Sequence, residues 1–81
     1  MYSGKQKHAT LNTIEKVKKF VNEANKFNSD IDVIRGRYTI DGKSMLGIFT
    51  IDLTFPVKIR IDSNDQAEIA RFNEHMEEFL T

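Results

Sequence analysis

The sequence predicts an α+β fold, with an antiparallel sheet that carries helices on one face. Apolar residues at helical spacing lie near both ends of the chain, and alternating apolar residues lie between them. The resulting order is helix, hairpin, short helix, strand and helix, which is typical of a two-layer α+β arrangement. The 81 residues suffice for one small domain with a modest hydrophobic core.

The first helix is predicted from an apolar stripe that begins near residue 14. Its members are Ile14, Val17, Phe20, Val21 and Ala24, and Phe27 extends it. Asn12 and Glu15 have the spacing of a capping box, and Thr13 is the competing N-cap. The polar run "NSD" at residues 28–30 ends this helix. A strand before Asn12 remains open on the sequence alone.

A β-hairpin is predicted for residues 31–40. Ile31 and Val33 alternate with their neighbours, Gly36 supplies the turn, and residues 38–40 return as a short strand. A second turn follows at the dipeptide "DG".

The stretch "KSMLGIFTIDL" at residues 43–53 fits two different structures. Four of its apolar residues have helical spacing, namely Met45, Leu46, Phe49 and Leu53. Ser44 would be a suitable N-cap for that helix. The β-branched residues between 48 and 51 suit a strand equally well. Gly47 weakens both interpretations because glycine loses the most conformational freedom on folding.

The last two elements have clearer patterns. Residues 57–61 alternate strictly between apolar and basic side chains, as in a half-buried strand, and Pro56 precedes them where no donor is needed. Asp65 and Glu68 form a capping-box pair at the start of the final helix. The apolar stripe of that helix consists of Ile69, Phe72, Met76, Phe79 and Leu80.

The net charge is zero, but the two ends of the chain differ in sign. Six lysines against two glutamates give residues 1–26 a charge of +4, and six acidic side chains against Arg71 give residues 62–81 a charge of −5. Two solvated helix surfaces of opposite sign explain this better than a basic partner-facing side. Nucleic acid binding through Lys16, Lys18 and Lys19 is an alternative, but no GxxG loop or aromatic RNA-binding strand accompanies them.

Several kinds of chemical site find no support in the sequence. The "GKS" at residues 42–44 lacks a phosphate-loop glycine five residues earlier, where Arg37 stands. No cysteine is present, and neither His8 nor His75 has a second ligand at metal spacing, so no metal or cofactor is expected. His75 is interpreted as a surface residue, and His8 as a residue without an orienting partner.

Three runs of sequence together resemble the HPr family, the small phosphocarriers of the bacterial sugar phosphotransferase system. They are "FVNEANKFNSDIDV", "GKSMLGI" and "VKIRI", followed by an amphipathic acidic helix. The resemblance extends from about Thr10 to the C-terminus. It implies an HPr-like open-faced β-sandwich of order βαββαβα, with four antiparallel strands in a single domain covering residues 1–81. It also implies that residues 45–50 form a short helix.

The resemblance implies that phosphocarrier chemistry is lost. The family's phosphoryl-bearing histidine falls at Thr13, the neighbouring arginine at Glu15 and the following proline at Lys16. A threonine has no imidazole, and a glutamate would repel a phosphoryl group, so no catalytic residue is expected. His8 falls in the family's first strand, several residues before the helix.

The serine site of the family is retained at Ser44, which the resemblance implies as a kinase target. The expected partner-binding residues are Lys43, Met45, Leu46, Phe49 and Lys16. From the residues alone, Ser44 is a plain helix cap.

The sequence is therefore interpreted as a cytoplasmic, HPr-like regulatory module that binds proteins and is not an enzyme. The expected partners are phosphotransferase-system or HPr kinase-type proteins, without membrane association. The N-terminus carries no signal peptide and no segment has the length of a membrane span. The alternatives are a phosphocarrier with a non-standard site, a nucleic-acid binder and a purely structural paralogue.

Overall fold

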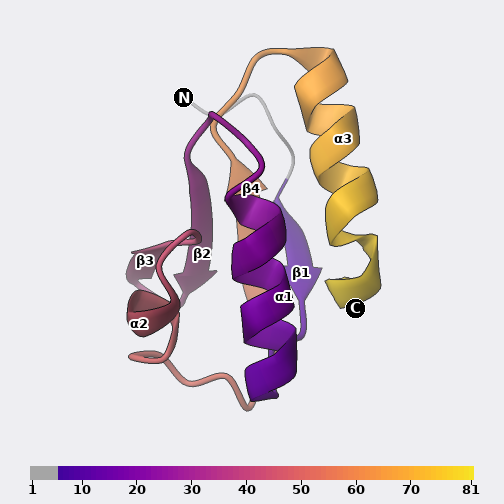
Figure 1. Cartoon of the computed structure of the whole chain (residues 1–81). Helices are drawn as coiled ribbons and strands as arrows, with labels where there is room; N and C mark the ends of the chain where they lie inside the picture. The colour runs from indigo at the N-terminus through magenta and orange to yellow at the C-terminus, as the bar shows by residue number, and fades with distance from the viewer. Residues whose placement is uncertain (1–5) are drawn as a thin grey trace.

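The computed structural model describes residues 6–81, so Lys5 of the basic N-terminal third lies outside the described part. The elements follow the order βαββαβα and end in a short 3-10 helix (Figure 1). They are β1 (Lys7–Ala9), α1 (Ile14–Ala24), β2 (Ile31–Arg35), β3 (Tyr38–Asp41), α2 (Met45–Ile48), β4 (Val57–Ile61), α3 (Gln66–Met76) and η1 (Glu77–Phe79). The predicted α+β fold and its element order are confirmed, including the strand before Asn12.

The four strands form one antiparallel sheet in the order β1-β4-β2-β3. Val33 on β2 lies opposite Ile59 on β4 and Ile40 on β3, so the apolar residues of three strands face the same side. The hairpin turns at Gly36, whose φ of 59° lies in the left-handed region that glycine favours. The predicted hairpin and its turn are therefore present, with β3 ending one residue later than predicted, at Asp41.

The helices cover the apolar face of the sheet, and the core lies between the two layers (Figure 1). The fully buried large side chains come from every layer: Leu11, Val17, Phe20, Ile31, Val33, Ile48, Val57, Ile59, Ile61, Phe72 and Met76. On the opposite, open face, Arg60 Nε donates to Asp32 Oδ2 at 3.0 Å. This asymmetry explains the alternation that predicted β4.

The helix caps differ in detail from their predictions. Thr13, the competing candidate, caps α1 because its side chain accepts from the Lys16 backbone N–H. Asn12 instead accepts from Lys16 Nζ. Asp65 caps α3 as predicted, but Glu68 accepts from Ser29 Oγ at 2.6 Å and so ties the helix to the loop after α1.

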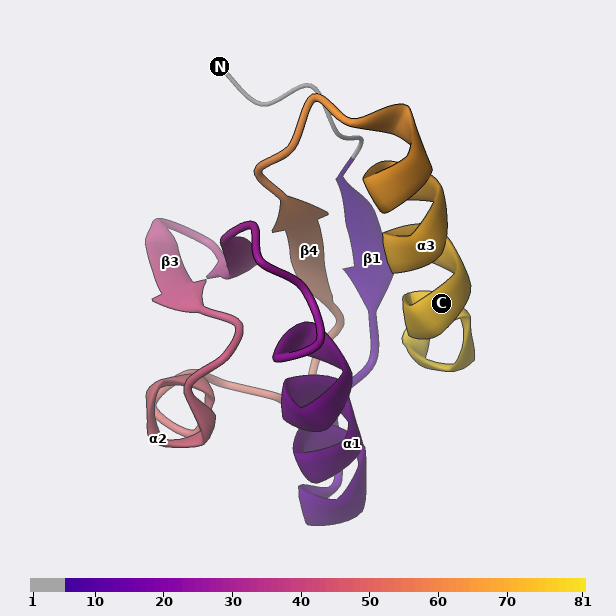
Figure 2. The same cartoon turned by 45° about the horizontal axis from the view of Figure 1, so that its top comes forward.

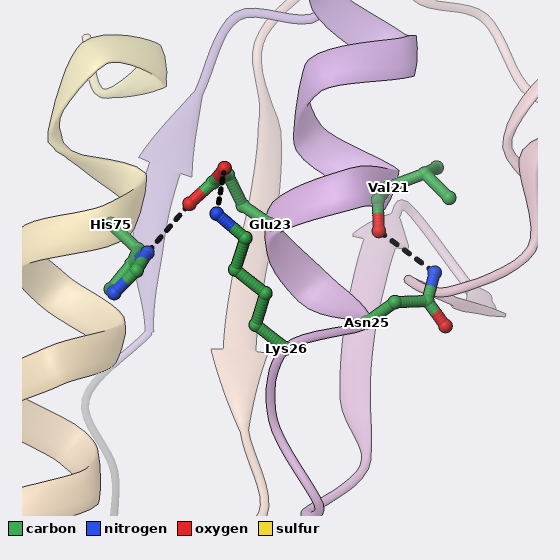
Figure 3. A network of polar contacts seen from close by, with 5 residues as sticks. All are labelled: Val21, Glu23, Asn25, Lys26 and His75. Atoms are coloured by element: carbon green, nitrogen blue, oxygen red, sulfur yellow. Dashed lines mark hydrogen bonds and ion pairs between the residues drawn. The ribbon is translucent and has the colours of Figure 1, made fainter.

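His75 joins α3 to α1 and is not the simple surface residue that was predicted. Its Nδ1 lies 2.6 Å from Glu23 Oε1, and Lys26 Nζ donates to the other oxygen of Glu23 (Figure 3). The imidazole also meets the Phe27 ring edge-to-face at 5.3 Å between centroids. The pKa of Glu23 is lowered in the folded protein. The largest cause is the hydrogen bond with His75, and the next is the hydrogen bond from Lys26.

The ambiguous stretch after the hairpin forms the short helix α2 and not a strand. Ser44 caps this helix. The backbone N–H groups of Ile48 and Phe49 donate helical hydrogen bonds to the carbonyls of Ser44 and Met45. The helix ends before residue 50, and residues 52–56 form an irregular connection to β4. The helical interpretation is therefore correct, but the helix expected over residues 45–50 ends two residues earlier, at Ile48.

Candidate functional site

The N-terminus of α1 is the first part of the candidate site. Thr13 Oγ1 accepts from Lys16 N at 3.1 Å, so the hydroxyl is engaged as a helix cap. Glu15 lies exposed in the first turn, where a negative side chain interacts favourably with the helix dipole. The side chain of Ile14 is 59 % exposed, although the apolar stripe predicted it to face inward. The first turn of α1 extends past the strands, which explains this exposure (Figure 1).

The N-terminus of α2 is the second part of the site. Ser44 Oγ accepts from the Gly47 backbone N–H at 3.1 Å, and the Ser44 N–H donates to Asp41 O at 3.1 Å. Ser44 is half-buried, so its capping hydroxyl lies at the edge of the surface. The "GKS" sequence is therefore a turn and a helix start, and Gly42 packs against Ile31 rather than opening a loop.

Lys43 has a structural role that the sequence did not reveal. Its Nζ donates to the Phe27 carbonyl at 2.6 Å, and its backbone N–H donates to Asp41 Oδ1 at 2.9 Å. The first of these bonds connects the start of α2 to the loop after α1, and the second stabilises the turn before α2. The ammonium group of Lys43 is therefore already engaged beside Ser44.

The predicted partner-binding residues differ in their accessibility. Leu46 is 83 % exposed and Phe49 is 43 % exposed, so both present apolar surface to solvent. Met45 instead packs against the core, and Lys16 is half-buried beside Asn12. The freely accessible part of the predicted surface consists of Leu46 and Phe49.

Two further apolar residues are also exposed, and the sequence analysis did not identify them as candidates. They are Ile14 on the first turn of α1 and Phe55, which is 57 % exposed in the segment before β4. The first turn of α1, α2 and the connection that follows α2 lie at the same end of the molecule in both views (Figures 1 and 2). We call Ile14, Leu46, Phe49 and Phe55 the apolar end. In the sequence, Ile14 and Phe55 look like any other apolar residue. Their exposure depends on tertiary packing, so the sequence alone does not reveal it.

His8 lies on β1 opposite Lys58 on β4 and is exposed. Within residues 6–81, no group of three or more His, Asp or Glu side chains could hold a metal ion. No helix in the same range is long and apolar enough to cross a membrane. Of the lysines on α1, Lys18 and Lys19 are exposed. The predicted basic helix face is thus partly a solvated surface.

Comparison with known proteins identifies a family for most of the chain. The family profile described as "PTS HPr component phosphorylation site" matches residues 14–81. The match begins immediately after Thr13 and includes all of α1, Ser44 and the remaining elements.

One solved structure with the same fold is the selenomethionyl Crh of Bacillus subtilis, a catabolite repression protein described as a dimer with a swapped domain. The two structures align with a TM-score of 0.61 and 23 % sequence identity, over 90 % of this chain and 88 % of Crh. A search of curated proteins gave no significant match.

Proposed function

The chain belongs to the HPr family of the phosphotransferase system, and from this premise we propose that it is a regulatory protein-binding module without histidine phosphocarrier activity. The observation that carries the proposal is the contrast between the two helix starts. At α1, Thr13 has an engaged hydroxyl, and the resemblance to HPr proteins implies that it stands where those proteins carry the phosphoryl-bearing histidine. At α2, Ser44 caps the helix beside exposed apolar residues, and the resemblance implies that it is the family's serine site.

The chemistry at Thr13 supports the loss of phosphocarrier activity. A phosphoryl carrier needs a nucleophile whose bond to phosphorus is labile, and imidazole provides this while a threonine hydroxyl does not. Thr13 Oγ1 also satisfies the Lys16 backbone N–H, so its release would leave that donor unsatisfied. Glu15 adds a negative charge in the same turn, which would repel an incoming phosphoryl group.

Ser44 supports a different use of phosphate, as a covalent mark. A kinase would transfer the γ-phosphoryl group of ATP to Ser44 Oγ, with loss of the hydroxyl proton and release of ADP. The product would place about −1.5 to −2 charges beside the free N–H groups of α2. Asp41 lies next to this position, and the ammonium of Lys43 is bound to Phe27. The local charge would therefore change strongly and would be little compensated within the chain.

The apolar end supplies a surface for a protein partner, whose binding would respond to the charge change at Ser44. Leu46 and Phe49 flank the buried Ile48, so α2 faces the core with one side and solvent with the other. Interfaces typically combine an apolar centre with a polar rim. HPr-family proteins interact with proteins of the phosphotransferase system, and we propose that this chain binds a protein of that kind through the apolar end.

The regulatory half of the proposal is tested with an HPr kinase and ATP. We expect one acid-stable phosphate on the wild-type chain and none on the Ser44→Ala variant. The matched control is the Thr10→Ala variant, which removes a hydroxyl group immediately after β1. This variant should be labelled like the wild type. Absence of label on the wild type under conditions that label an authentic HPr would leave Ser44 as a helix cap alone.

A further inference from the structure

A shallow depression of about 540 Å³ lies at the hairpin end of the sheet. It is lined by residues 35–38 of the hairpin and by residues 50–52, which follow α2. Neither Ser44 nor Thr13 contributes to it. Small-molecule sites commonly have volumes of about 300–1,000 Å³, so the depression has room for a small ligand.

Arg35 and Arg37 both line the depression, and the one carboxylate in its lining is Asp52, whose charge interacts with that of Arg35. Among residues 6–81, the side chains of Arg35 and Arg37 form no hydrogen bond and no ion pair, whereas Arg60 is paired with Asp32. Nε of Arg35 is buried and unpartnered, which is unfavourable for a charged donor. An oxyanion in the depression would pair with the terminal Nη groups of the arginines, and Nε of Arg35 would gain an acceptor only after a shift of its side chain.

Arg35 is held in place by an aromatic contact. Its guanidinium carbon lies 5.3 Å from the centroid of the Phe55 ring. A stacked guanidinium loses less side-chain entropy when it binds an anion, because its orientation is already restricted. The contact therefore prepares one of the two arginines for binding.

Asp52 limits the charge of the ligand that the depression can accept. Its carboxylate accepts from the Thr54 backbone N–H at 2.9 Å, and this bond is the main cause of its lowered pKa. Asp52 is therefore ionised at neutral pH. With two arginines and one aspartate, the lining carries one net positive charge, which matches a monoanion better than a dianion.

The remaining walls favour an organic body on the anion. Tyr38 is 60 % exposed, and Ile51 lies across the depression on the segment after α2. Thr50 already donates its hydroxyl to the Gly47 carbonyl at 2.6 Å, so it offers no free donor to a ligand. The attraction for an anion thus comes from the arginines, and Tyr38 and Ile51 supply the apolar surface of the depression.

We propose that this depression binds a small organic carboxylate with an aromatic or apolar body, held through its carboxylate by Arg35 and Arg37. The site shares Phe55 with the apolar end, but it does not depend on the proposed regulatory function, because it uses neither Ser44 nor the exposed residues of α2. Arginine matches the planar carboxylate by paired hydrogen bonds. Tyr38 and Ile51 would contact the body of the ligand.

The proposal is tested by titrating the ¹⁵N-labelled full-length chain with phenylacetate and following amide chemical shifts. We expect saturable shifts confined to residues 35–38, 50–52 and their immediate neighbours. The Arg35→Gln variant should weaken binding by about tenfold or more, and Arg37→Gln by about fivefold. Asp52→Asn should tighten it by about threefold, since a repelling charge is removed. The matched control is Arg71→Gln on α3, which should bind like the wild type.

Two other probes test the charge assignment. Phenylacetamide has nearly the same shape without the charge and should not bind, and phenyl phosphate should bind more weakly than phenylacetate because it is largely dianionic at pH 7.5. Shifts scattered over the molecule, unchanged affinity in the folded Arg37→Gln variant, or equal binding of phenylacetamide would overturn the carboxylate site. Tighter binding of phenyl phosphate would overturn the monoanion assignment.

Discussion

Gly47 on α2 lies directly against Ile40 on β3. A Cβ added at Gly47 would be 2.9 Å from Ile40 Cγ2 and 3.2 Å from Ser44 Oγ. The close approach of helix to strand and the Ser44 cap therefore both depend on the missing side chain. Glycine is unfavourable inside a helix, so tertiary packing outweighs helix propensity at this position.

The first prediction concerns this contact. The Gly47→Ala variant should be less stable by about 1–3 kcal/mol, because the new methyl group must displace Ile40 or the cap. Asn22→Ala, at an exposed position of α1, is the control and should raise stability by a few tenths of a kcal/mol, roughly its propensity gain. Urea unfolding followed by circular dichroism measures both. A Gly47→Ala variant as stable as Asn22→Ala would show that α2 does not approach β3 so closely.

The second prediction concerns the cap of α2. Ser44→Ala removes the acceptor for the Gly47 N–H and should lower the free energy of unfolding by about 1 kcal/mol. Ser44→Asp retains an acceptor and should stay within about 0.5 kcal/mol of the wild type. Equal stability of wild type and Ser44→Ala in urea would mean that the hydroxyl does not cap the helix.

The third prediction concerns the two sides of α2. Ile48→Ala removes a fully buried side chain and should cost about 2–5 kcal/mol. Leu46→Ala removes one that is 83 % exposed and should change stability by less than about 0.5 kcal/mol. Thermal unfolding of both variants checks this orientation. Comparable losses from the two substitutions would place Leu46 in the core and remove it from the proposed partner surface.

The fourth prediction concerns the pH dependence of the α1–α3 contact. The pKa of Glu23 is lowered in the folded protein from its ordinary value of 4.5, mainly by His75. Its contribution to stability is therefore present above about pH 4.5 and is lost as the pH falls through the lowered value. Glu23→Gln should flatten the fall in unfolding free energy between pH 5 and pH 3, measured by urea titration. The control is Glu78→Gln on η1, which should keep the wild-type slope, and the same slope in Glu23→Gln would contradict the linkage.

Much of the fold follows from local patterns in the sequence. The alternation in residues 57–61 and the stripes of the two long helices correspond to β4, α1 and α3, because each buries one face against the same core. Residues 43–53 were ambiguous since their spacing and β-branched content conflict. The contact of Gly47 with Ile40 is a tertiary feature that the local pattern does not encode.

The candidate site was less accessible to sequence analysis. The resemblance to HPr indicated Thr13 and Ser44, but the exposure of Ile14 and Phe55 depends on where α1 and the segment before β4 pass the sheet. The link from His75 to Glu23 joins residues far apart in the chain. The arginine depression likewise forms only when residues 50–52 lie beside the hairpin.

The central claim is the absence of histidine phosphocarrier activity, and one measurement tests it most directly. The chain is incubated with phosphoenolpyruvate and the first enzyme of the phosphotransferase system, beside an authentic HPr, and acid-labile phosphate is counted by intact-protein mass spectrometry. We expect full labelling of HPr and none of this chain, since Thr13 carries no imidazole. Acid-labile phosphate on the chain that disappears in a His8→Ala variant would contradict the account and identify a phosphocarrier with a displaced site.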